Sequence, residues 1–110
     1  PNLHVIALGV SRYKDASLNL DYAAKDAKDI ARFWKRPLEG FGEVRITEVL
    51  DEDVTRGNFG KLRDALEKTN VDDQVVLFMA GHGMLDEKLD YYFVTHDFRR
   101  DAPSVNGLPY

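Results

Sequence analysis

The 110-residue sequence contains no cysteine, which excludes disulfides and thiolate metal sites within it. It also lacks long apolar runs. The longest, near residues 5–10 and 75–80, fall far short of the roughly 20 residues that a membrane-spanning helix needs. No charged start followed by an apolar core marks a signal peptide. These absences predict a protein that does not cross a membrane and that fits the cytoplasm.

An excess of positive charge is missing as well. Fifteen Lys and Arg stand against nineteen Asp and Glu, for a formal net charge of −4 with both signs interspersed. Proteins that bind a phosphate backbone present a basic surface, so we expect no nucleic-acid partner. Because the chain begins with Pro1 instead of Met, we expect it to be part of a longer polypeptide.

Three apolar segments have the pattern of β-strands. Residues 3–10 (LHVIALGV) and 74–80 (QVVLFMA) are rich in branched apolar residues, which is typical of strands covered on both faces in a parallel sheet. Residues 44–50 (VRITEVL) alternate apolar and polar side chains, as a strand nearer a sheet edge does.

The segments between these strands have helical periodicity. The first helix is expected to begin near Asp21 as its N-cap and to end before Pro37. The second has Thr55 or Asn58 as its cap and runs to about Thr69. The first helix shows one apolar stripe, formed by Ala23, Ala27, Ile30, Ala31 and Trp34.

The alternation of strand and helix predicts right-handed crossovers and a parallel sheet with the spatial order second, first, third strand (2-1-3). With helices on both faces, the fold class is α/β, a three-layer sandwich. Residues 11–20 form a loop too long for a minimal connection, so a further role is expected for it. Residues 89–95 are expected to form a short strand or hairpin, and residues 97–109 are rich in turns.

His82 is the clearest functional candidate. It follows the third strand directly, and parallel sheets gather ligands outside the carboxyl ends of their strands. The flanking Gly81 and Gly83 leave the backbone open, and the N–H after such a histidine can point at a developing oxyanion. We interpret His4 and His96 as structural rings bonded to backbone carbonyls, and the same role is the alternative for His82.

Three blocks of sequence follow one another in a recognisable order: VIALGVSRY at residues 5–13, LDYAAKDA at 20–27 and AGHG at 80–83. Together they resemble the caspase-like cysteine peptidases, particularly bacterial members of the caspase, paracaspase and metacaspase group. The likeness covers nearly the whole chain. Residues 106–110 (NGLPY) also resemble the segment that leads, in these peptidases, into the helix before the nucleophile strand.

The resemblance implies a cysteine endopeptidase in which His82 handles the proton and the Gly83 N–H helps to hold the oxyanion. In the family the nucleophilic cysteine ends the next sheet strand, so we expect it roughly 20 to 35 residues beyond Tyr110. Residues 1–110 would then be the N-terminal part of one caspase-like peptidase domain, inactive alone. The expected partners are a protein or peptide substrate and the missing C-terminal part of the domain, with no cofactor.

The resemblance also implies a residue that binds the substrate side chain before the cut. Metacaspases carry a Gly-Cys-x-x-Asp block whose aspartate binds Arg or Lys. Asp26 matches that aspartate, although the Gly-Cys pair is absent. The arginine with which caspases bind aspartate would fall near Leu20, which is apolar. Cleavage after Arg or Lys is therefore expected, and the alternative is that Asp26 is a solvated charge beside an i,i+4 pair of Lys25 and Asp29.

The acidic residues after His82 do not predict a metal site. Asp86, Glu87 and Asp90 lie in a short segment that supplies few of the six to eight oxygens that calcium requires, so we expect a solvated hairpin and no metal. The alternative to an enzyme is a non-catalytic caspase-like scaffold or regulatory interaction domain.

Without a next strand, residues 74–80 would form an exposed sheet edge, so self-association of the chain is also expected.

Overall fold

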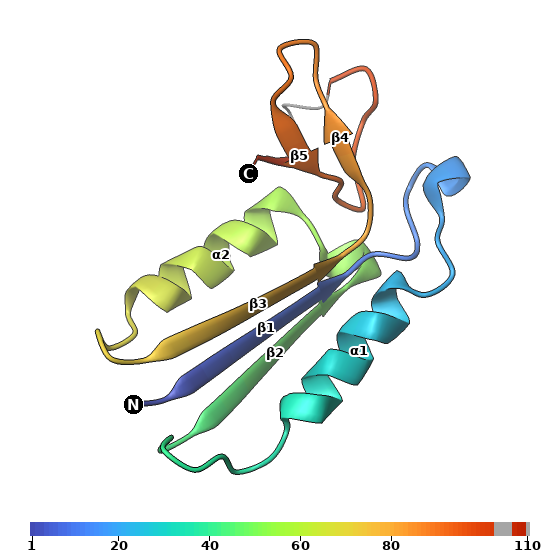
Figure 1. Cartoon of the computed structure of the whole chain (residues 1–110). Helices are drawn as coiled ribbons and strands as arrows, with labels where there is room; N and C mark the ends of the chain where they lie inside the picture. The colour runs from blue at the N-terminus through green and yellow to red at the C-terminus, as the bar shows by residue number, and fades with distance from the viewer. Residues whose placement is uncertain (103–106, 110) are drawn as a thin grey trace.

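A parallel sheet forms the centre of the computed structural model, which describes residues 1–102 and 107–109. Strand β1 (Leu3–Gly9) lies between β2 (Val44–Leu50) and β3 (Gln74–Ala80), as Figure 1 shows. Both neighbours run parallel to β1. This arrangement confirms the predicted order 2-1-3. A helix connects each strand to the next one in the sequence, as parallel strands require.

Two helices cover opposite faces of this sheet (Figure 1): α1 (Ala23–Trp34) and α2 (Arg56–Glu67). On one face, Ala27 and Ala31 of α1 pack against Ala7 of β1. On the other face, three apolar side chains of α2 pack against the cluster that contains Ile6 and Leu8 of β1. These side chains are Phe59, Leu62 and Leu66. The predicted three-layer α/β fold is therefore confirmed.

Gly9 marks the closest approach of α1 to the sheet. A Cβ atom at this position would lie 2.7 Å from both the Ala23 carbonyl oxygen and the Ala27 Cβ. Such distances are too short for real side chains, so close packing requires a glycine at the end of β1. This contact sets the position of the first helix relative to the carboxyl end of the sheet.

The helix starts differ in part from the prediction. Thr55 is the N-cap of α2, and its Oγ1 accepts a hydrogen bond from the Asn58 N–H at 3.2 Å. The expected cap of α1 by Asp21 is wrong. That helix has Tyr22 at its N-cap position without a side-chain bond, and Ser11 Oγ accepts from the Ala24 N–H at 2.8 Å instead. A residue distant in sequence thus supplies the acceptor that local pattern assigned to Asp21.

A small antiparallel sheet stands above the carboxyl ends of the main sheet (Figure 1). Its strands are β4 (Gly83–Leu85), β5 (Tyr91–Phe93) and β6 (Leu108–Pro109), in that order. Short 3-10 turns, η1 (Ala16–Leu18) and η2 (Asp51–Asp53), follow β1 and β2. The predicted hairpin is confirmed, whereas Asn106 and Tyr110 of the segment 106–110 lie outside the described residues.

No helix within residues 1–102 and 107–109 is both long enough and apolar enough to span a bilayer.

Candidate functional site

His82 lies between the two sheets. Strand β3 ends at Ala80 and β4 begins at Gly83, so the histidine occupies the connection at the carboxyl end of the parallel sheet. Its side chain is half-buried. A Cβ at the neighbouring Gly81 would lie 3.0 Å from the Tyr13 hydroxyl oxygen, so the glycine lets the tyrosine approach the backbone here.

The loop after β1 holds the imidazole in place. His82 Nε2 lies 2.8 Å from the Leu18 carbonyl oxygen. A carbonyl can only accept, so Nε2 carries a proton, and in the neutral ring Nδ1 therefore has the free lone pair. The contact with Leu18 thus leaves Nδ1 as the nitrogen that can take up a proton. This carbonyl contact is also what a structural histidine would make, so strand-end position and flanking glycines remain the functional argument.

Tyr13 holds the backbone of the same histidine. Its hydroxyl oxygen accepts a hydrogen bond from the His82 N–H at 3.1 Å, and the two ring centroids are 5.5 Å apart. Burial raises the pKa of Tyr13, the hydrogen bond from His82 partly opposes this, and the charge of Asp51 raises the pKa further. The phenol therefore stays neutral at physiological pH and serves as a fixed acceptor for the histidine backbone.

Polar side chains fasten this loop to the neighbouring strand. Asp51, which directly follows β2, accepts from the N–H groups of Ser11 and Arg12 through Oδ1, at 2.8 and 3.0 Å. Asn19 Oδ1 accepts from the Tyr13 N–H at 2.8 Å. The long loop 11–20 thus has the further role that its length suggested, because it connects the end of β2 to the imidazole.

Gly83 begins β4 opposite Phe93 of β5. The Val94 N–H donates to the His82 carbonyl at 2.9 Å, which makes Gly83 and Phe93 a non-hydrogen-bonded pair. In such a pair the Gly83 N–H points away from β5. A Cβ at Gly83 would overlap the Tyr91 ring, so the site also needs a glycine for steric reasons. The N–H is free of the ladder, as an oxyanion donor has to be.

Asp26 lies apart from this hydrogen-bond network. It is exposed in the first turn of α1, so its carboxylate is not the buried group that a closed pocket would contain. Its neighbour Lys25 bonds Asp29 at 2.7 Å, which confirms the expected i,i+4 pair. The role of Asp26 in substrate binding stays a prediction.

The other two histidines differ from each other. His96 Nδ1 lies 2.7 Å from the Arg12 carbonyl oxygen, which confirms the structural interpretation. His4 is not bonded to a carbonyl as expected, because its Nε2 lies 3.1 Å from Oδ2 of Asp73. A carboxylate at the start of β3 takes the place of the backbone acceptor.

The acidic loop between β4 and β5 is a closed turn. Asp86 Oδ1 accepts from the N–H groups of Lys88 and Asp90, both at 2.9 Å. The hydrogen bond from the Asp90 N–H lowers the pKa of Asp86 most, burial opposes it, and the hydrogen bond from the Lys88 N–H lowers the pKa further. In the part of the chain that the structure describes, no group of three or more His, Cys, Asp or Glu side chains is arranged to hold a metal ion.

Sequence reasoning missed Leu18, Tyr13 and Asp51. Leu18 acts through its backbone carbonyl, which leaves no signature in side-chain identity. Asp51 did carry a usable signal, because it is a polar residue at the carboxyl end of a parallel strand, as His82 is.

Comparison with known families agrees with this geometry. The caspase domain model matches residues 3–108, which is nearly the whole chain. The chain therefore belongs to the caspase domain family, a family of cysteine peptidases. No curated protein and no solved structure gave a significant match.

Proposed function

We propose that this chain supplies the histidine and the oxyanion donor of a cysteine endopeptidase. The observation that carries the proposal is the place of His82 at the carboxyl end of β3, beside a Gly83 N–H that β5 leaves free. The 2.8 Å contact between His82 Nε2 and the Leu18 carbonyl keeps the proton on Nε2 and leaves Nδ1 as the base. The Gly83 N–H, directed away from β5, is the donor for the oxyanion.

The proton transfers follow from these atoms. Nδ1 takes the proton of a cysteine thiol, and the thiolate attacks the scissile carbonyl. The imidazolium is stabilised by the hydrogen bond that Nε2 donates to Leu18. Nδ1 then gives its proton to the leaving amine, which completes general acid–base catalysis at one nitrogen.

The nucleophile comes from polypeptide outside these 110 residues, which contain no cysteine. We assign it to a further strand that pairs with β3. The exposure of Val75 and Leu77 of β3, 46% and 48%, supports this assignment, because large apolar side chains on a sheet are normally covered. The Gln74 N–H donates to the carbonyl of Asn2, the residue before β1. The alternation of the ladder therefore turns the backbone groups of Val75 and Leu77 outward, toward a next strand.

Substrates of this enzyme are proteins or peptides cut after Arg or Lys, with Asp26 binding the cationic side chain. Two facts support Asp26. Its carboxylate is exposed at the end of α1 that adjoins the loop holding His82, and the nearby ammonium of Lys25 is already bound by Asp29. Charge-assisted pairing with a guanidinium would then give the preference for Arg.

Covalent labelling tests this function. An arginyl chloromethyl ketone should alkylate one cysteine of the protein that contains this chain, and mass spectrometry should place that cysteine downstream of residue 110. Asp26→Asn should slow labelling by the arginyl reagent, whereas Asp64→Asn, at an exposed acid of α2 on the other face of the sheet, should not. Labelling by an aspartyl reagent alone would refute the role of Asp26. An inert thiol, or no downstream cysteine, would refute the enzyme in favour of a caspase-like scaffold.

A further inference from the structure

A second polar cluster lies at the amino-end edge of the parallel sheet, the edge away from His82. There a cavity of about 340 Å³ opens between α2 and the first residues of β1 and β2. Asp73 of this cluster immediately precedes β3, whereas His82 follows that strand, so the length of β3 separates the two sites. The cavity is therefore independent of the peptidase site.

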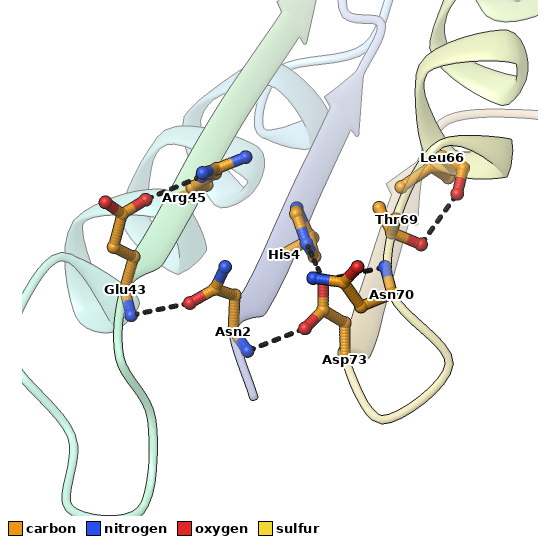
Figure 2. Close-up of polar contacts among 8 residues, drawn as sticks. All are labelled: Asn2, His4, Glu43, Arg45, Leu66, Thr69, Asn70 and Asp73. Atoms are coloured by element: carbon orange, nitrogen blue, oxygen red, sulfur yellow. Dashed lines mark hydrogen bonds and ion pairs between the residues drawn. The ribbon is translucent and has the colours of Figure 1, made fainter.

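The polar wall of the cavity is a preorganised pair (Figure 2). Asp73 Oδ1 accepts from the Asn2 N–H at 2.8 Å, and Oδ2 accepts from His4 Nε2 at 3.1 Å and from the Asn70 N–H at 3.2 Å. The side chains are 4% exposed for Asp73 and 12% for His4. Both oxygens of this carboxylate thus accept hydrogen bonds from groups of the protein itself.

Cationic groups at the same cavity are left with less compensation. Among the residues that line it in the described part of the chain, Asp73 is the one acid, while Arg45 and Lys68 are both cations. Arg45 bonds Glu43 through Nε at 2.8 Å, which leaves its terminal amino groups for another acceptor. Lys68 forms no ion pair within residues 1–102 and 107–109. Lys68 is therefore the cation at the cavity that no acid in the described part of the chain pairs with.

Apolar side chains also line the cavity. They are Leu62, Ala65 and Leu66, all from α2. A volume of about 340 Å³ is at the lower end of the roughly 300–1,000 Å³ of small-molecule sites, which also combine apolar walls with a few placed polar groups. The cavity thus suits a compact ligand that has one apolar side and one charged end.

We propose that this cavity binds a small organic acid. Its carboxylate lies against Arg45 and Lys68, and its apolar body packs on Leu62 and Leu66. The three hydrogen bonds to Asp73 weaken the repulsion between its carboxylate and the bound anion, because their dipoles oppose the negative charge. The site is built from the starts of β1, β2 and β3 and the end of α2, so occupation would tie these elements together.

An NMR titration of the full chain tests the proposal, with benzoate as the probe. Benzoate should give saturable shifts at the amides of Lys68 and Asn70. Benzyl alcohol, which lacks the charge, and inorganic phosphate, which lacks the apolar body, should each bind at least about tenfold more weakly, since loss of one charged hydrogen bond or of the apolar contact costs about that factor.

Matched variants locate the site. Lys68→Met should weaken benzoate binding about tenfold or more, whereas Lys61→Met, an exposed lysine of α2 that does not line the cavity, should leave it unchanged. The absence of saturable shifts up to about 10 mM benzoate, above the ~1 mM range of weak ligands, would overturn the proposal. So would equal binding of benzyl alcohol, equal binding of phosphate, or an equal effect of the two lysine variants.

Discussion

At the scale of single residues, the three histidines show how surroundings decide a role. Each ring has one nitrogen bonded to an oxygen: Leu18 for His82, Asp73 for His4 and Arg12 for His96. Residue type and hydrogen bonding alone therefore do not single out a catalytic ring. His82 differs because it stands at the end of a parallel strand, next to a glycine N–H that the neighbouring strand leaves free.

Asp86 gives a prediction at this scale that concerns pH. Its folded-state pKa is lowered, so its contribution to stability is present above the unfolded pKa of about 4 and is lost as the pH falls toward the folded value. Asp86→Asn keeps an acceptor for the two N–H groups but cannot be protonated. The loss of stability between pH 7 and pH 3, measured by urea unfolding, should become smaller in this variant.

Asp64→Asn is the matched control, because Asp64 is exposed on α2, away from the hairpin. It should keep the acid sensitivity of the original protein. An identical loss of stability in the original protein and in Asp86→Asn would show that the turn carboxylate does not contribute to acid sensitivity.

At the scale of elements, sequence periodicity predicts the strands but not the long-range hydrogen bonds that fix the helix and the loop beside them. Residues 44–50 and 74–80 were predicted with their observed bounds, because alternation and branched apolar runs depend on local sequence. The cap of α1 could not be predicted in this way, because the Ser11 hydroxyl bonds the Ala24 N–H across a loop and no local pattern encodes that contact. The same holds for Leu18, whose carbonyl meets His82 from 64 residues away in the sequence.

Gly9 supports a prediction about how α1 meets β1. Gly9→Ala should lower the free energy of unfolding by about 1–3 kcal/mol, because the new methyl group would overlap Ala23 and Ala27. Gly60→Ala is the matched control. It lies inside α2 with nothing within 4 Å of the added Cβ, so it should stabilise the protein by about 0.5–1 kcal/mol. Urea unfolding measures both, and a neutral Gly9→Ala would contradict the close packing of α1.

At the scale of the whole molecule, the main sheet is asymmetric. Its two edges are β2 and β3, and β3 has Val75 and Leu77 exposed. Edge strands with exposed apolar side chains and free backbone groups pair readily with other chains. This asymmetry fits the proposal that further polypeptide of the same domain covers β3, and it makes self-association of the isolated 110 residues an expected consequence.

Leu77→Lys tests that consequence. A charge in the middle of the exposed edge should disfavour strand pairing, so sedimentation velocity should show concentration-dependent association of the original chain and less of it in the variant. Val71→Lys, in the exposed turn before β3, introduces the same charge away from the edge and should associate like the original. A chain that stays monomeric at all concentrations would contradict the role of β3 as an uncovered edge.

The most direct test of the account is the catalytic efficiency of His82→Ala in the protein that contains this chain and its nucleophile. We predict that kcat/KM for an Arg-containing peptide falls by roughly 10³-fold or more, as for other members of a catalytic unit, while the lost hydrogen bond to Leu18 lowers stability by only about 1 kcal/mol. His96→Gln, whose amide can still donate to the Arg12 carbonyl, should keep most of the activity. Near-normal turnover by His82→Ala would contradict the assignment of this histidine as the acid–base group.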